Sequence, residues 1–256
     1  MAVLAFHNTD PGIISGLNNY RPNRFKKLLL ILKQSGYAFL SLDDYLRSED
    51  RRDKISLTFD DGLESFYNHA FPILQELGVP SAVFIPLDFI GKRDTWDYTS
   101  FISPTRHLNH EQIYDLANRG VTIGAHGLNH ECLVGMGPRR LRQQLSRPKK
   151  GLEELTGRKV RYLTYPFGRF DREVETAALE CGYSKGFSLT HWRKSPTGFT
   201  LPRFGAYAFD TPWSIINKSR PGLLNEVEKI KGAVMNQYSG GTIALNRIRS
   251  LFSSKG

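Results

Sequence analysis

The sequence predicts an α/β fold in which a parallel β-sheet is covered by helices. Short apolar runs alternate with segments of helical period at least five times, and the connections between them are short. The composition is 40% hydrophobic and 23% charged over 256 residues, which excludes a disordered chain. A single (β/α) barrel domain commonly has about 250 residues. A closed barrel and an open, doubly wound sheet both satisfy this pattern.

Six apolar runs are predicted to be strands, and the most apolar of them are expected to be buried on both faces. These runs are residues 2–6, 54–59, 81–85, 121–125, 160–164 and 183–189. Four helices are predicted between them, because each ends at a glycine suited to a left-handed C-terminal cap. The helices are residues 25–35, 63–77, 110–119 and 172–181, with Asn109 and Asp171 as N-caps of the last two.

The chain offers no segment for crossing a membrane. Its longest apolar run, residues 28–32, is far shorter than the roughly 20 residues that span a bilayer, so we expect no stable membrane insertion. The opening MAVLAFHNTD lacks the basic region of a secretory signal. We therefore expect a cytoplasmic protein, or an exported one whose leader has been removed. Cys132 and Cys181 show no disulfide or zinc spacing, and we expect free thiols.

The formal net charge of +10 favours an acidic partner, such as nucleic acid, anionic lipid or an anionic glycan. Residues 139–150 contain six cations and no acid. No aromatic residue is interleaved there to stack on bases. We therefore expect a solvated helix face and no nucleic-acid partner.

Polar groups directly follow four of the predicted strands. They are His7 after VLAF, Asp60 and Asp61 after ISLTF, His126 and His130 after VTIGA, and the turn at residues 165–168 after RYLT. In a parallel sheet, ligands bind at the carboxyl ends of the strands. We therefore expect these groups to meet at one edge of the sheet and to form the functional site.

The paired histidines and aspartates indicate a metal site. His126 and His130 are four residues apart, which puts both imidazoles on one face if the segment makes a helical turn. Two histidines and one carboxylate can hold a metal and leave positions open for water and substrate. Asp60 and Asp61 follow a buried run, where ionised carboxylates need a compensating cation. The alternatives are a chance pair of surface histidines, and one aspartate that caps a helix while the other faces solvent.

TFDDG, HGLNH and YPFG resemble, in order and spacing, three motifs of the polysaccharide deacetylase family, also called the NodB-homology or carbohydrate esterase family 4 domain. The similarity covers about residues 54–210, with further similarity in the strand ending at His7 and in LPRF at residues 201–204. The resemblance implies a single-domain, irregular (β/α) barrel. It divides the chain into an N-terminal strand and helices packed on the barrel (1–53), the deacetylase core (54–210) and a C-terminal helical extension (211–256).

The resemblance also implies roles for individual residues. Asp61, His126 and His130 would hold a divalent metal, with zinc as the first expectation. Asp60 would be the general base while metal-bound water attacks an acetamide carbonyl. The backbone N–H of Phe167 would hold the oxyanion. The expected activity is hydrolytic removal of N-acetyl groups from an amino-sugar polysaccharide or glycoconjugate.

Three positions depart from the family pattern. Gly127 stands where the family commonly has a serine or threonine that braces the loop, so we expect weaker metal affinity. Thr164 stands where many members have an arginine that pairs with the catalytic aspartate. Arg203 is the candidate substitute, and an ordinary surface arginine is the alternative. The family's late Leu-x-His proton donor is not found; His7 and His191 are the candidates, and His7 has the better position.

Other residues were weighed for the site. Trp96, Trp192 and Trp213 are candidate platforms for sugar rings, with core packing as the alternative. The long segment 90–104 is a candidate lid or substrate wall. The remaining histidines lie in or beside predicted helices and receive no role; they are His69, His107 and His110.

Two further functions stay open at this point. One is O-deacetylation of a polysaccharide, which needs the proton donor less and is therefore favoured by the missing late histidine. The other is a catalytically inactive carbohydrate-binding homologue, against which the intact aspartates and histidines argue. In each case the partner is an acetylated carbohydrate. The sequence predicts neither its identity nor the oligomeric state.

Overall fold

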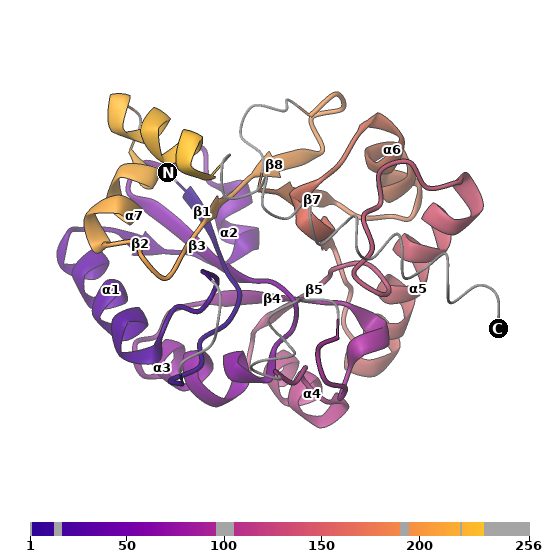
Figure 1. Cartoon of the computed structure of the whole chain (residues 1–256), viewed down its shortest axis with the longest axis horizontal. Coiled ribbons are helices and arrows are strands. Elements are labelled where there is room, and N and C mark those ends of the chain that lie inside the picture. Colours follow the sequence, from indigo (N-terminus) through magenta and orange to yellow (C-terminus); the bar gives the residue numbers. More distant parts are fainter. Residues whose placement is uncertain (1, 13–16, 96–104, 190–194, 221, 233–256) are drawn as a thin grey trace.

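A computed structural model describes residues 2–12, 17–95, 105–189, 195–220 and 222–232 (Figure 1). Among these residues one parallel sheet has the strand order β8-β7-β6-β5-β4-β3-β1-β9, with β2 beside β3. The strands are β1 (Ala2–Phe6), β2 (Ala38–Phe39), β3 (Lys54–Phe59), β4 (Ser81–Ile85), β5 (Thr122–Ala125), β6 (Tyr162–Thr164), β7 (Lys185–Ser188), β8 (Thr200–Pro202) and β9 (Phe204–Gly205). The sheet curves into a nearly closed barrel, which confirms the predicted fold class.

Helices surround the strands on the outside of the barrel (Figure 1). They are α1 (Pro22–Gln34), α2 (Leu42–Arg47), α3 (Phe71–Glu76), α4 (His110–Asn118), α5 (Pro138–Thr156), α6 (Arg172–Glu180) and α7 (Pro212–Ser219). The last of these, α7, packs against α1, so the segment that follows the barrel returns to the beginning of the chain. Residues 223–232 are also helical.

The barrel closes through a single extended segment. Its first half, β8, pairs with β7, and its second half, β9, pairs with β1 at the other end of the strand order. Only Arg203 separates the two strands, and its backbone N–H donates to Ser188 O at 2.8 Å. Arg203 therefore stands at the seam of the barrel, with its side chain fully buried.

Two apolar layers hold the structure together. The larger lies between strands and helices, and includes Leu57 of β3 and Phe25 of α1. The smaller includes alternate residues of the strands, such as Phe84 and Phe187. Gly124 of β5 makes room for this packing, because a Cβ at that position would lie 2.3 Å from the Phe84 ring. Such side-chain alternation follows from the two-residue period of a strand.

The predicted strands all form, and three of them have the predicted bounds. Asn109 and Asp171 cap α4 and α6 through their side chains, as predicted. The four terminating glycines, Gly36, Gly78, Gly120 and Gly182, all have positive φ. The continuous α-helix expected at 63–77 was wrong in detail, because a π-helical segment at Phe66–Ala70 precedes α3. The predicted division into three parts stays a prediction.

The basic segment lies on α5 and is largely paired with acids. The pairs are Arg140–Glu131, Arg142–Glu180, Lys149–Glu153 and Lys150–Glu154. This is the behaviour of a solvated helix face. Cys132 and Cys181 are free thiols. Within the described residues, no helix combines the length and apolarity needed to cross a bilayer.

Candidate metal centre and acid–base pair

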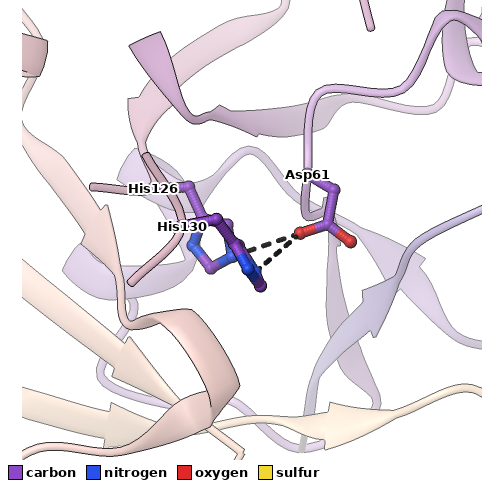
Figure 2. A group of neighbouring side chains, drawn as sticks. All are labelled: Asp61, His126 and His130. Atoms are coloured by element: carbon purple, nitrogen blue, oxygen red, sulfur yellow. Dashed lines mark ion pairs between the residues drawn. The ribbon is translucent and has the colours of Figure 1, made fainter. Parts of the chain in front are cut away.

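The polar groups that follow the strands come together, as predicted. β5, β4, β3 and β1 are neighbours in the sheet, so parallel strands deliver Asp61 and the two histidines to the same edge. The ligand atoms of Asp61, His126 and His130 all lie within 4.8 Å of one another. Figure 2 shows both imidazoles directed at the Asp61 carboxylate.

The cluster has the geometry of a cation site. Asp61 Oδ1 is 3.3 Å from Nε2 of His126 and 3.3 Å from Nε2 of His130. His126 Nδ1 lies 3.0 Å from the carbonyl oxygen of Thr164, to which it donates. A neutral His126 therefore presents the lone pair of Nε2 to a carboxylate oxygen. Two facing acceptors need a positive charge between them, which a metal ion or a ring proton supplies.

The pKa shifts of Asp61, His126 and His130 also reflect how closely these three side chains interact. Burial alone would raise the pKa of Asp61, but the close contacts with His126 and His130 hold it well below its usual value. Burial would lower the pKa of His126, yet the contact with Asp61 and the charge of Asp60 raise it. Burial prevails at His130 and lowers its pKa. The donor set of one carboxylate and two imidazoles fits a divalent transition metal.

The two histidines do not converge through a helical turn. The segment from His126 to His130 is non-helical, and two of its residues, Gly127 and His130, have left-handed backbones with φ of 74° and 56°. The helical turn considered from the four-residue spacing was therefore wrong, although the imidazoles do meet, with ring centroids 4.9 Å apart. A tight loop, not a helix face, brings the rings together.

Arg203 forms a bidentate pair with Asp60. Its Nη1 donates to Oδ1 at 2.8 Å and its Nη2 to Oδ2 at 2.6 Å. Nη1 also donates to Thr58 Oγ1 at 2.8 Å. The pair meets the distance of about 3 Å expected for a charge-assisted hydrogen bond. Burial would raise the pKa of Asp60, but the Arg203 guanidinium lowers it, so the carboxylate stays ionised.

The remaining predicted residues also lie at this end of the barrel. His7 follows β1 and lies close enough to Asp60 and Asp61 to interact electrostatically with both. The Phe167 ring packs edge-on against His130 with centroids 4.8 Å apart. Phe167 has a left-handed backbone with φ of 60°. Together with Asp61 and His130, it makes up three of the four non-glycine residues with positive φ in the described chain, and such strain is typical of functional sites.

Several residues considered from the sequence are not among the described side chains of the metal cluster. His191, Trp96 and Trp192 lie outside the described residues, as does most of the segment 90–104. Trp213 is described, stands near the start of α7 and is 74% exposed. Trp213 is not part of the apolar core.

Sequence reasoning missed one residue beside the cluster. His107 was given no role, yet it is buried and its Nδ1 lies 2.7 Å from the carbonyl oxygen of Asp61. Burial lowers the pKa of His107, so its neutral ring donates to this carbonyl. The contact supports the left-handed backbone of Asp61, where φ is 68°. No sequence signal connects two residues that are 46 positions apart.

Comparison with known proteins agrees with this geometry. The model of the polysaccharide deacetylase family matches residues 47–186. The chain belongs to this family. It is therefore a hydrolase of the polysaccharide deacetylase class, which confirms the resemblance in the three motifs. The YxkH protein of Bacillus subtilis, named as a polysaccharide deacetylase, is 26% identical over 228 residues, covering 81% of this chain and 75% of that protein.

More distant relatives share the fold. A Streptococcus pyogenes deacetylase, PplD, in complex with acetate has a TM-score of 0.72 at 20% identity, and covers 86% of this chain and 98% of its own. IcaB from Ammonifex degensii has a TM-score of 0.70 at 24% identity, over 85% of this chain and 94% of its own. The poly-β-1,6-N-acetyl-D-glucosamine N-deacetylase of Staphylococcus aureus is 20% identical, and this chain covers 65% of its length.

Proposed function

We propose that this deacetylase removes N-acetyl groups from an amino-sugar polysaccharide or glycoconjugate with the help of one divalent metal. The observation that carries the proposal is the Asp61, His126 and His130 cluster beside the buried Asp60–Arg203 pair. A relative in Staphylococcus aureus is named for N-deacetylation of a β-1,6-linked N-acetylglucosamine polymer, which supports the amino-sugar substrate class.

Asp61, His126 and His130 would hold the metal, with zinc as the first candidate. Their one carboxylate oxygen and two imidazole nitrogens leave coordination positions open for water and substrate. When bound, a divalent metal polarises a carbonyl and lowers the pKa of water towards about 7.

Asp60 is the proposed general base. Arg203 keeps it ionised and fixes the plane of its carboxylate through two hydrogen bonds. Asp60 would take one proton from water as the water oxygen bonds to the acetamide carbon. Its place next to Asp61 in the chain puts it beside the metal ligands.

The other two roles concern the oxyanion and the leaving amine. The backbone N–H of Phe167 would donate to the carbonyl oxygen as that oxygen becomes negative. When the C–N bond breaks, the sugar amine needs a proton, and His7 is the proposed donor. Acetate and the free amino sugar would leave.

The test combines metal analysis with acetate release from a panel of acetylated glycans. We expect about one divalent metal per chain and release of acetate from N-acetylated glucosamine polymers. Release only from O-acetylated polysaccharides would replace the proposal with esterase activity. Metal binding without acetate release would indicate a carbohydrate-binding homologue that has lost catalysis. Cell fractionation tests the cytoplasmic location, which stays a prediction.

A further inference from the structure

The loop between the two metal-suited histidines has an unusual backbone. Gly127 has φ of 74°, and His130, which is not a glycine, has φ of 56°. The left-handed backbone is disfavoured for residues other than glycine, because Cβ comes too close to the following carbonyl oxygen. A loop of this shape is therefore kept only if its surroundings hold it, and the contacts that hold it determine where the His130 ring points.

One side chain from the helix layer reaches into this loop. Gln144 lies on α5 and is 3% exposed. Its Oε1 accepts the backbone N–H of Leu128 at 3.0 Å, and its Nε2 donates to Asn129 Oδ1 at 2.6 Å. Both ends of one buried amide thus hold two successive residues between His126 and His130.

Backbone groups of a neighbouring segment hold the same loop. The backbone N–H of Asp88 donates to Leu128 O at 2.8 Å, and the N–H of His126 donates to Ile85 O at 3.0 Å. These contacts come from β4 and the turn after it, and they reach as far as the carbonyl of Leu128. Gln144 adds the N–H of Leu128 and the side chain of Asn129, the residue before His130.

Asn129 extends this connection to the surface of α5. Its Nδ2 donates to Glu131 Oε1 at 2.9 Å, and Glu131 pairs with Arg140. The loop is therefore tied to α5 on both sides of His130. A Cβ at Gly127 would make only ordinary contacts, 3.6 Å from Gln144 Oε1 and 3.4 Å from Pro166 Cγ, so glycine is favoured there by its φ of 74° and not by lack of space.

We propose that Gln144 is a positioning residue that sets the placement of His130 relative to His126 and thereby the metal affinity. The inference rests on the metal site of the proposed function. Gln144 lies outside the three motifs and contacts neither imidazole, so it acts through the backbone of Leu128 and the side chain of Asn129. It supplies the loop support that was expected to be weak at Gly127.

The experiment compares Gln144→Leu and Gln144→Glu with Gln143→Leu as the matched control. Gln143 is the preceding residue on the same helix, and it is exposed. Zinc affinity is measured by competition with a chromogenic chelator, and the coordination geometry by the absorption spectrum of the cobalt(II)-loaded protein. Exchange of the Leu128 amide hydrogen in metal-free protein reports the contact itself.

Gln144→Leu is expected to weaken zinc binding by about 10- to 100-fold, the usual effect of removing a partner behind the ligands. The cobalt spectrum should change and the Leu128 amide should exchange faster. Gln144→Glu keeps the acceptor but loses the donor, so it should recover part of the affinity. Gln143→Leu should match the unaltered protein in all three measurements.

Zinc affinity and a cobalt spectrum in Gln144→Leu equal to those of Gln143→Leu would overturn the inference, since a residue that only stabilises the fold would leave both unchanged. If Gln144→Leu does not fold, Asn129→Ala replaces it, with a fall in zinc affinity of up to about 10-fold expected. Normal affinity in both Asn129→Ala and Gln144→Glu would then overturn the inference.

The outcome is separable from that of the proposed function. An unaltered protein that binds zinc but releases no acetate would refute the deacetylase proposal and leave the role of Gln144 standing. An unaltered protein that binds no divalent metal would overturn the metal site and, with it, this inference.

Discussion

Two buried ion pairs involve the segment from Arg203 to Lys218, and they differ in what surrounds them. Arg203–Asp60 joins the seam between β8 and β9 to the end of β3. Lys218–Asp210 joins α7 to the segment that follows β9. All four side chains are at most 3% exposed. Burial alone therefore does not distinguish the two pairs.

The partners of the two carboxylates do distinguish them. Asp210 accepts the Ser214 hydroxyl at 2.8 Å and the Tyr207 backbone N–H at 2.9 Å in addition to Lys218. Lys218 also donates to the Gly205 carbonyl at 2.8 Å. Lys218 Nζ also lies 3.9 Å from Oε2 of the buried Glu228, so several groups of the fold surround this pair, as expected of a structural connection.

Asp60, in contrast, is held by one fork of two hydrogen bonds from Arg203. A carboxylate has about four acceptor positions, so lone pairs remain for a proton or a water. Asp60 also adjoins Asp61, whose carboxylate faces two imidazoles. The same kind of ion pair is therefore a structural connection in one place, while in the other it leaves the proposed base Asp60 with free acceptor positions.

The largest effect should come from Asp60→Asn, which tests the first half of this comparison. Asparagine keeps the shape but cannot accept the proton, so turnover should fall by about 10² to 10⁴ while the metal stays bound. The measurements are acetate release and metal content. His126→Ala is the contrast, because it should remove the metal with little change in secondary structure. Loss of the metal from Asp60→Asn would show that the two aspartates had been assigned the wrong way round.

Lys218→Met tests the other half, and should act on stability alone. Removing one partner of a buried pair leaves Asp210 uncompensated, which lowers the free energy of unfolding by about 3–5 kcal/mol. Urea denaturation measures this loss. Below the unfolding transition, acetate release per folded molecule should be unchanged, and adding Asp210→Asn should restore part of the stability. A specific fall in turnover would mean that this pair, too, serves the site.

Arg203→Ala should lower both stability and turnover, because Arg203 lies at the seam of the barrel and pairs with the proposed base, Asp60. Loss of hydrogen bonds to a charged group corresponds to about 1.5–3 kcal/mol, or about 10- to 150-fold in kcat/KM. Because Arg203 lowers the pKa of Asp60, its removal should raise the acidic pKa of the kcat/KM profile. Activity would then be lost at a higher pH as the solution is acidified.

Arg203→Lys should retain only part of the activity that Arg203→Ala loses, because an ammonium lacks the planar fork that orients a carboxylate. An unchanged acidic limb in Arg203→Ala, measured on folded protein, would argue that Asp60 is ionised without help from Arg203. The pair would then resemble Lys218–Asp210 more closely than its surroundings suggest.

Sequence patterns predicted the parts of this molecule that depend on neighbours in the chain. The strands at residues 2–6, 54–59 and 81–85 were predicted to the residue, because their short apolar runs end at His7, at Asp60 and at Pro86. The parallel order follows from short crossovers. The strand-end rule also brought Asp61, His126 and His130 together. These predictions needed only local periodicity and the geometry of a parallel sheet.

The parts that sequence reasoning missed depend on contacts between distant segments. β8 and β9 are too short for a periodic signal. Gln144 and His107 support metal-suited residues through contacts that span 16 and 46 positions. The spacing of His126 and His130 suggested a helical turn, because a left-handed residue such as His130 leaves no mark in the sequence. Arg203 could be proposed only because a family arginine was missing.

The smallest effect is expected at the position that this arginine would have occupied. Thr164 makes two contacts with His126 Nδ1, from its carbonyl oxygen at 3.0 Å and from its hydroxyl oxygen at 2.6 Å. Thr164→Val removes the hydroxyl and keeps the carbonyl, so the ring keeps an acceptor for its Nδ1 proton. Zinc affinity should therefore fall by less than the roughly 10-fold typical of losing a ligand's only partner. Thr122→Val is the matched control, because Thr122 lies at the end of β5 that is far from His126, and this variant should bind zinc normally. A fall of 100-fold in Thr164→Val would show that the hydroxyl, and not the backbone, orients His126. Thr164 would then be as necessary to the metal site as Arg203 is to the proposed base.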